Sequence, residues 1–116
     1  MKINFPRIVR EVNLNEYAPE LDGQKIFVWV NPPSKELAEL DDLNKAYVED
    51  DKALDPYLDK LAVLLSQGPD EKAHCSRDDL KEIIEGTAET DPLFWNWLQV
   101  RIVREVNDHR LQRKKA

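Results

Sequence analysis

The chain has 116 residues, the size of one domain, and a domain of this length buries about two thirds of the surface of its unfolded chain. Hydrophobic residues make up 41% of the sequence, charged residues 34%, and only 3 residues are glycine, which together favour helices over a turn-rich β-sandwich. The net charge of -6 argues against nucleic acid as the main partner, because nucleic-acid binding requires a concentrated basic surface.

Residues 1–33 are predicted to form an extended segment with a β-hairpin. Residues 25–30, KIFVWV, are rich in β-branched and aromatic side chains and are predicted to form a strand that ends at the Asn-Pro-Pro of residues 31–33. Residues 8–14 are predicted to form the second strand, and residues 18–23, APELDG, are typical of a turn. Because a two-stranded ribbon is marginally stable by itself, we expect its apolar face to pack against the helices that follow or against another chain.

Residues 34–112 are predicted to form a helical body, which gives a mainly α protein with a small N-terminal antiparallel β-hairpin: an α+β fold with about four helices in a single domain, residues 1–116. Ser34 suits the N-cap of a first helix that continues to about residue 50. The side chains at helical spacing, predicted to point inward, are Leu37, Leu40, Leu43, Asn44, Tyr47 and Val48. The opposite face is acidic and carries Glu36, Glu39, Asp41, Asp42, Glu49 and Asp50.

Proline and glycine mark the ends of the second helix. Asp55-Pro56 is predicted to start it, because proline suits the first helical turn, and Gly68-Pro69 is predicted to end it. Residues 70–75 then form a polar connection. The apolar stripe of this helix consists of Tyr57, Leu58, Leu61, Ala62, Leu64 and Leu65.

A capping box is predicted at the start of the third helix, where the Ser76 side chain caps the helix together with Asp79. Gly86 is predicted to end this helix. The inward residues are Leu80, Ile83 and Ile84. The last helix starts at Asp91-Pro92, and residues 113–116 form a basic tail.

The last helix is apolar on two sides. Its first face consists of Phe94, Trp95, Leu98, Ile102 and Val106, and the nearly opposite side consists of Leu93, Trp97 and Val100. Such a helix must lie between layers of the domain or bury one side against a partner. We therefore expect a protein partner, for example an amphipathic helix, to contact Phe94, Trp95, Trp97, Leu98, Arg101 and Trp29.

Charge is unevenly distributed, because residues 101–116 contain six basic and two acidic residues, a net charge of +4 that leaves -10 for the rest of the chain. This basic end is either a solvated helix end that complements the helix dipole or a surface that attracts an acidic partner or another copy of the chain. A homo-oligomer is thus one expected arrangement.

A heptapeptide, RIVREVN, occurs twice, at residues 7–13 and 101–107. We predict a strand for the first copy and a helix for the second, which requires tertiary contacts to override local preference. A helical N-terminus is the competing interpretation.

No catalytic motif is found, so we expect no enzyme activity, no cofactor and no metal. His74 and His109 lack a second histidine at the spacing of a helical zinc site, and Cys75 has no second cysteine. The three glycines are isolated and form no phosphate-binding loop. The sequence contains no signal peptide and no apolar run long enough for a membrane span, so we expect a cytoplasmic protein without membrane contacts.

The segment VNLNEYAPELDGQKIFVWVNPPSKEL, residues 12–37, resembles the opening of the tail assembly chaperones of long-tailed, siphovirus-type bacteriophages. Residues 91–115 are similar to the C-terminal helix of that family, which carries a Trp-Leu pair and a basic end. The resemblance implies a chaperone in the bacterial host cytoplasm that binds the helical tape measure protein and tail subunits. It also implies that a longer product arises by frameshifting. The alternatives are a structural or connector subunit of a phage particle, or a small nucleic-acid-binding regulator.

Overall fold

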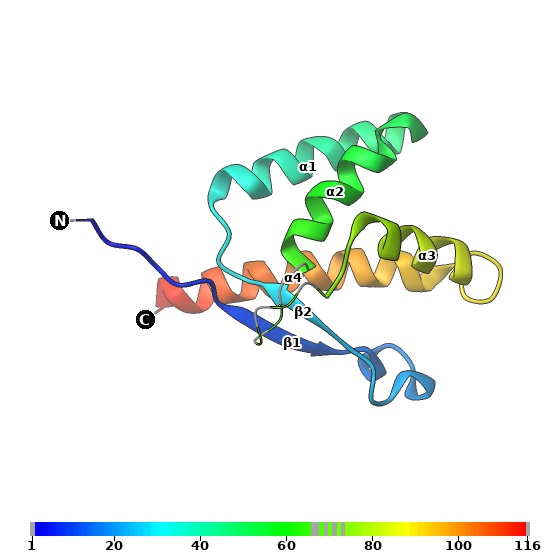
Figure 1. Ribbon diagram of the computed structural model, residues 1–116, viewed down its shortest axis with the longest axis horizontal. Coiled ribbons are helices and arrows are strands. Elements are labelled where there is room, and N and C mark those ends of the chain that lie inside the picture. Colours follow the sequence, from blue (N-terminus) through cyan, green and yellow to red (C-terminus); the bar gives the residue numbers. More distant parts are fainter. Residues whose placement is uncertain (1, 66–67, 69, 71, 73, 116) are drawn as a thin grey trace.

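A computed structural model describes residues 2–65, 68, 70, 72 and 74–115. Two strands come first and four helices follow (Figure 1), in agreement with the predicted α+β fold. The elements in chain order are β1 Val9–Asn13, β2 Lys25–Trp29, α1 Ser34–Glu49, α2 Leu54–Leu65, α3 Arg77–Thr87 and α4 Leu93–Lys115. Short 3-10 turns lie at η1 Leu14–Glu16, η2 Pro19–Leu21 and η3 Asp51–Ala53.

The two strands pair antiparallel, with Val9 opposite Trp29 and Val12 opposite Ile26. Val12 and Val28 point into the core, at 1% and 0% exposure, because alternate residues of a strand face the same side. The first copy of RIVREVN is therefore mostly strand, and the competing interpretation of a helical N-terminus is wrong. In the predicted turn, Gly23 has a φ of 86°, a conformation that strongly favours glycine.

Helix α1 starts differently from the prediction. Pro33 is the N-cap residue and Ser34 is already the first helical residue, so the predicted cap at Ser34 is wrong. Leu40 is buried as predicted, but Asn44 and Val48 are exposed. The reason is that α1 packs against α2 along one side only, which leaves its other side open to solvent.

Helix α2 matches its prediction closely, since all six residues of its apolar stripe are buried. It starts at Leu54, one residue before the predicted Asp55-Pro56, and ends at Leu65. The predicted stop at Gly68-Pro69 falls in part outside the described residues. Lys60 of α2 forms ion pairs with Glu36 at 2.7 Å and with Glu39, which tie α2 to α1.

The predicted capping box of α3 is present. The Ser76 side chain accepts a hydrogen bond from the Asp79 backbone, and the Asp79 carboxylate accepts from the Ser76 backbone at 2.8 Å. The predicted stop at Gly86 is wrong by one residue, because α3 continues to Thr87, whose hydroxyl donates to the Ile83 carbonyl at 2.7 Å.

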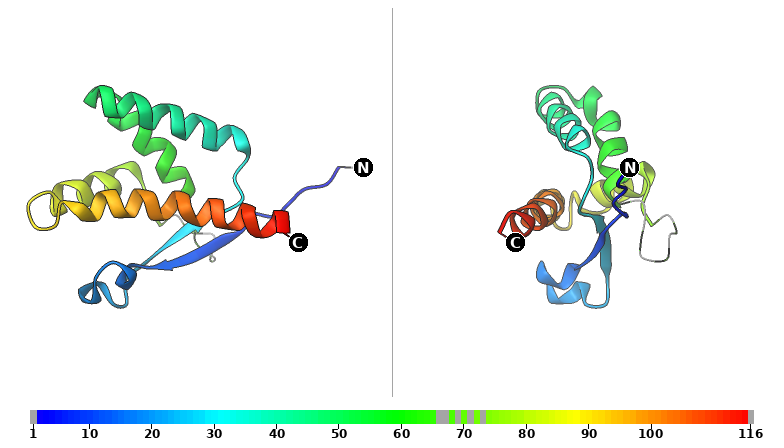
Figure 2. Two further views of the ribbon diagram at one scale, coloured as in Figure 1. Left: turned by 180° about the vertical axis from the view of Figure 1, so that it is seen from behind. Right: turned by 90° about the vertical axis from the view of Figure 1, so that its left-hand side faces the viewer.

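Helix α4 runs along the molecule, which measures 52 × 34 × 28 Å (Figure 1). One face of α4 packs into the core through Phe94, Leu98, Ile102 and Val106, each at most 7% exposed. This face contacts β2 and α3, while α1 and α2 form a pair on another side (Figure 2). The opposite side of α4 remains largely uncovered, with Leu93 71% exposed and Val100 59% exposed.

Candidate functional site

A groove of about 970 Å³ lies between α1 and α4. The two helices flank it and run in opposite directions along the molecule (Figure 2). They do not pack against each other along most of their length, because α1 packs on α2 and α4 packs on α3 and β2. The apolar half of the groove lining consists of Leu37, Ala38, Leu40, Tyr47, Val48, Tyr57, Val100 and Val103.

Tyr57 of α2 forms the floor of the groove. Its side chain is only 3% exposed, its ring stacks on Tyr47 of α1 at 5.7 Å, and its hydroxyl donates a 2.8 Å hydrogen bond to Gln99 of α4. Burial, and then repulsion from Tyr47, raise the pKa of Tyr57 to about 12, so the hydroxyl keeps its proton at neutral pH. One buried side chain therefore joins the helices on both sides of the groove.

The two walls of the groove differ in which apolar side chains they expose. On α4, Val100 is exposed and Val103 is half-buried, because the core-facing positions of this helix are on its other side. On α1, Leu40 is buried while the small side chain of Ala38 is exposed. The groove thus has an apolar base with apolar side chains open to solvent on both walls.

Two of the three charged residues that line the groove, Asp41 and Arg104, are paired inside their own helices. Asp41 accepts from Lys45 at 3.1 Å, and Arg104 lies 3.8 Å from Asp108, each pair four residues apart. Exposed pairs of this kind contribute little to stability. Their charges cancel locally, so the middle of the groove carries no strong net charge.

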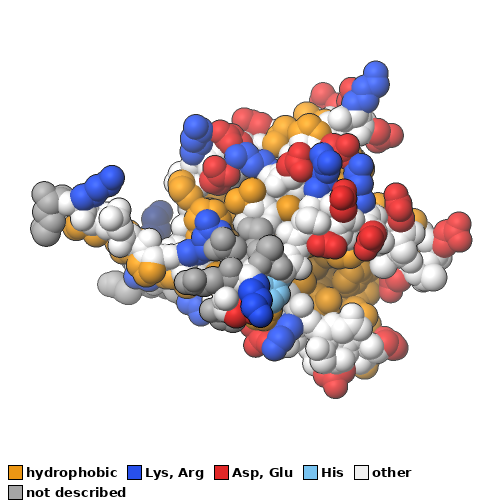
Figure 3. Space-filling model, viewed as in Figure 1, with side chains coloured by type: hydrophobic (Ala, Val, Ile, Leu, Met, Phe, Trp, Pro, Cys, Tyr) orange, Lys and Arg blue, Asp and Glu red, His pale blue; other side chains and the backbone are white. Residues whose placement is uncertain are grey.

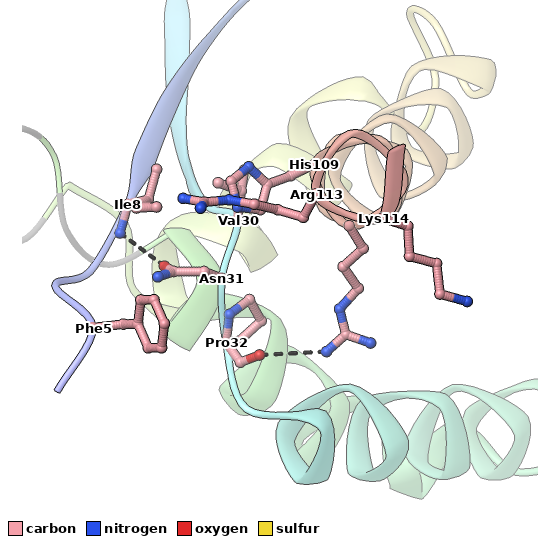
Figure 4. Close-up of a pocket in the computed structure, with 9 residues that line it drawn as sticks. Phe5, Ile8, Val30, Asn31, Pro32, His109, Arg113 and Lys114 are labelled. Carbon is pink, nitrogen blue, oxygen red and sulfur yellow. Dashed lines mark hydrogen bonds between the residues drawn. The ribbon is translucent and has the colours of Figure 1, made fainter. Parts of the chain in front are cut away.

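A second hollow, of about 560 Å³, lies at the C-terminal end of α4 (Figure 4). Its apolar part is formed by Phe5 and Ile8 before β1 and by Val30 and Pro32 after β2, and basic side chains of α4 flank it (Figure 4). The complete lining is Phe5, Ile8, Val30, Asn31, Pro32, His109, Arg110, Arg113 and Lys114. Among the residues that the structure describes, no carboxylate lines this hollow.

Asn31 holds the N-terminal segment against this hollow. Its side-chain oxygen accepts from the Ile8 backbone at 2.7 Å, and its side-chain nitrogen donates to the Pro6 carbonyl at 2.8 Å. Arg110 donates to the Pro32 carbonyl and to the Ser34 hydroxyl, both at 3.4 Å. Because Arg110 lines both the groove and the hollow, the two are neighbours with this guanidinium between them.

His109 is the one buried polar residue of the described core, at 7% exposure. Burial, and then the charges of Arg10 and Arg113, hold the pKa of His109 below its ordinary value. Its Nδ1 lies 3.4 Å from the Arg10 guanidinium, which can only donate, so Nδ1 is the acceptor. His109 is therefore neutral at pH 7 and adds no positive charge to the hollow.

Two of the residues expected to bind a partner belong to the protein interior, and a third, Trp97, is half-buried against other aromatic rings. Phe94 and Leu98 are 7% and 1% exposed, which leaves them almost no surface for a partner. Trp97 was expected on the side opposite Phe94, but its ring lies 6.0 Å from Phe94 and 5.3 Å from Tyr17. The turn after β1 supplies Tyr17, which covers the tryptophan, and a helical wheel contains no information about that turn.

The other three expected residues are partly buried and also have contacts within the chain. Arg101 is 18% exposed and donates to Glu16 at 3.0 Å and to Glu105 at 2.6 Å. Arg7 lies 3.9 Å above the ring of Trp29. Trp95 is half-buried, and its indole N–H, like that of Trp29, is buried without a hydrogen-bond partner in the described part of the chain.

None of the six expected residues lines the groove. On α4, Val100 lines the groove, and the helical wheel places it on the second apolar side of this helix. Tyr57 was predicted to be buried, but no sequence pattern indicated that it would contact both α1 and α4. The groove is therefore defined by tertiary arrangement, although several of its lining residues, Val100 among them, occupy positions that helical periodicity marks.

Within the described ranges, no three His, Cys, Asp or Glu side chains lie close enough together to hold a metal ion. In the same part of the chain, none of the helices combines the length and the apolar character required to cross a bilayer. No protein-family model, curated protein or solved structure matches this chain.

Proposed function

We propose that this chain is a helix-binding assembly chaperone that holds an amphipathic helix of a client protein in the groove between α1 and α4. The observation that carries the proposal is the open apolar groove itself, which has a fixed floor at Tyr57 and uncovered apolar side chains on both walls. Amphipathic helices bind in such grooves by placing their apolar stripe against the base.

The dimensions of the groove suit a helical client. Helix α1 has 16 residues, a length of about 24 Å at 1.5 Å per residue, and α4 extends beyond it at its C-terminal end. A client helix of four turns lying between them would bury Val100 and Ala38 and complete the cover of the half-buried Val103. The client's polar face would remain in water between the charged outer edges of α1 and α4.

The resemblance of residues 12–37 and 91–115 to bacteriophage tail assembly chaperones supports a specific version of this proposal. In that version the client is the tape measure protein, a long helical chain whose apolar faces need cover until the tail tube forms around it. The chain then acts by binding and performs no catalysis, and no cofactor is involved.

The test uses a labelled, 18-residue amphipathic helical peptide with a leucine stripe and a neutral polar face. Wild-type protein should bind it. Val100→Glu should weaken binding by tenfold or more, a loss of at least roughly 1.4 kcal/mol of binding free energy. Leu93→Glu is the matched control, since Leu93 is an exposed apolar residue of the same helix outside the groove. Ala38→Glu tests the other wall.

Fluorescence anisotropy gives the affinities, and circular dichroism checks that each variant is folded. All three positions are exposed, so the variants should unfold close to the wild-type temperature. The proposal fails if wild-type protein does not bind the peptide, or if Leu93→Glu weakens binding as much as Val100→Glu does.

A further inference from the structure

The groove has chemically different ends. At one end, α4 presents Arg110, Arg113 and Lys114, and the adjoining hollow contains no carboxylate among the described residues. At the other end, Tyr47 and Val48 line the groove and are followed directly by Glu49, Asp50 and Asp51, all exposed. The groove therefore runs from a basic end to an acidic end.

The face of the molecule seen in Figure 3 has the same polarity. Figure 3 shows Asp and Glu side chains crowded at the right-hand end, where α3 and the far end of α1 lie, while Lys and Arg predominate at the left-hand end. The C-terminal end of α4 and the N-terminal segment lie at that left-hand end (Figure 1). A ligand in the groove with charges at its two ends would interact electrostatically with both ends of the groove.

The helices beside the groove do not oppose this polarity. Helices α1 and α4 run in opposite directions, so their macrodipoles largely cancel for a ligand lying between them. The ion pairs Asp41–Lys45 and Arg104–Asp108 likewise cancel in the middle of the groove. The terminal side chains therefore decide the direction of the field along the groove.

A bound helix has its own polarity, with a positive N-terminus and a negative C-terminus. We infer that the groove binds its client helix in one direction only, with the client's C-terminal end at Arg110, Arg113 and Lys114 and its N-terminal end at Glu49–Asp51. This inference rests on the proposed function. The client would run parallel to α4 and antiparallel to α1, and the preferred client helix would be basic at its start and acidic at its end.

The basic end is built to receive a helix C-terminus. Arg110 is held by the Pro32 carbonyl and the Ser34 hydroxyl, so its guanidinium is fixed at the boundary between groove and hollow. Arg113 and Lys114 are exposed and form no ion pair among the described residues. They can therefore bind the free carbonyl groups and acidic side chains of a client's last turn.

Two peptides of identical composition test the direction. Both carry the same leucine stripe and a side-chain staple that locks the helix. One has three lysines in its first turn and three glutamates in its last turn, and the other has these charges exchanged. The staple is needed because the favoured peptide opposes its own helix dipole. Circular dichroism must show equal helicity before the affinities are compared.

The lysine-first peptide should bind tighter by roughly tenfold at low ionic strength. The difference should shrink in 0.5 M salt, because salt screens exposed charges over a distance of roughly 10 Å already at 0.1 M. Arg113→Glu combined with Lys114→Glu should abolish or invert this preference. Both positions are exposed at the end of α4, so the double variant should fold. A paramagnetic label on the peptide's C-terminus should broaden signals of Phe5 and Arg113, and a label on its N-terminus those of Val48.

The outcomes separate the two proposals. Equal affinity for both peptides, with each label broadening signals at both ends of the groove, would overturn the directional inference while helix binding stands. Tighter binding of the glutamate-first peptide would also overturn it. If neither peptide binds, the proposed function itself fails.

Discussion

The hydroxyl of Tyr17, in the turn after β1, donates a 2.5 Å hydrogen bond to the carboxylate of Asp91, immediately before α4. The Tyr17 ring also lies 5.2 Å from Phe94 and 5.3 Å from Trp97. This hydrogen bond raises the pKa of Tyr17, so the hydroxyl remains a donor. The turn of the hairpin is thus attached to the first turns of α4, where Tyr17 contacts Phe94 of the core face and Trp97 of the second apolar side.

Trp97→Ala should lower the free energy of unfolding by about 2 kcal/mol, less than the ~3–5 kcal/mol typical of a fully buried aromatic residue, because Trp97 is half-buried. Urea denaturation followed by circular dichroism measures the change. An unchanged stability together with weaker peptide binding would instead support the sequence-based prediction that Trp97 contacts a partner.

Tyr57→Phe should lower the free energy of unfolding by about 1 kcal/mol, because the hydrogen bond to Gln99 is lost while the ring and its stacking on Tyr47 remain. The control is Tyr47→Phe, whose hydroxyl makes no hydrogen bond in the described part of the chain. Chemical denaturation of both variants gives the comparison. An equal loss of stability in Tyr57→Phe and Tyr47→Phe would show that the hydrogen bond to Gln99 does not account for the effect.

Asn31→Ala should release the N-terminal segment, because the acceptor for the Ile8 amide and the donor to the Pro6 carbonyl are both removed. Hydrogen exchange at Ile8 should accelerate, and stability should fall by about 1 kcal/mol. Asn31→Asp keeps the acceptor and should protect Ile8 better than alanine does. Wild-type protection at Ile8 in the alanine variant would contradict this role of Asn31.

Stability should fall on acidification from pH 7.5 to 5.5. The folded state holds the pKa of His109 below its ordinary value, so the unfolded chain takes up the proton first as the pH falls. The stability present above about pH 6.5 is therefore lost as the pH falls through the folded pKa. The groups facing His109 are Arg10, Arg113 and Glu105. Glu39 and Asp55, whose pKa values are lowered by bonds to lysines, act only at more acidic pH. His109→Gln should flatten the pH dependence of stability between pH 7.5 and 5.5. An unchanged slope in this variant would contradict the assignment of the effect to His109.

Cys75 should react slowly with thiol reagents, because burial, and then repulsion from Asp79, raise its pKa to about 11. This rise of the pKa makes the thiolate fraction at pH 8 roughly a hundred times smaller than that of an ordinary cysteine. Ellman's reagent should therefore modify the native protein far more slowly than the urea-denatured protein. Equal rates would show that the thiol is not shielded.

Periodicity predicted the parts of the fold whose contacts are local. The stripe of α2 was predicted completely, because apolar residues recur at the helical period, and the capping box at Ser76 depends on residues only three positions apart. Local patterns gave less reliable helix ends. Gly86 lies inside α3, which continues to Thr87, and Ser34 follows the N-cap at Pro33.

Sequence patterns could not predict the groove, because it exists only through the placement of α1 against α2 and away from α4. Val48 shows the difficulty: helical spacing predicts that it points inward, yet it is 77% exposed at the end of the groove. The tryptophans were nominated for a partner because the sequence did not show that Tyr17 and Arg7 cover Trp97 and Trp29.

The repeated heptapeptide forms mainly strand at residues 7–13 and helix at residues 101–107, and its second and sixth positions point inward in both copies. A spacing of four returns to the same side in a strand and nearly so in a helix. In a nuclear magnetic resonance spectrum, each pair, such as Val12 and Val106, should give separate signals in the native protein that nearly coincide after unfolding. The two ends of this chain thus provide a built-in pair of chemically matched probes for following its folding.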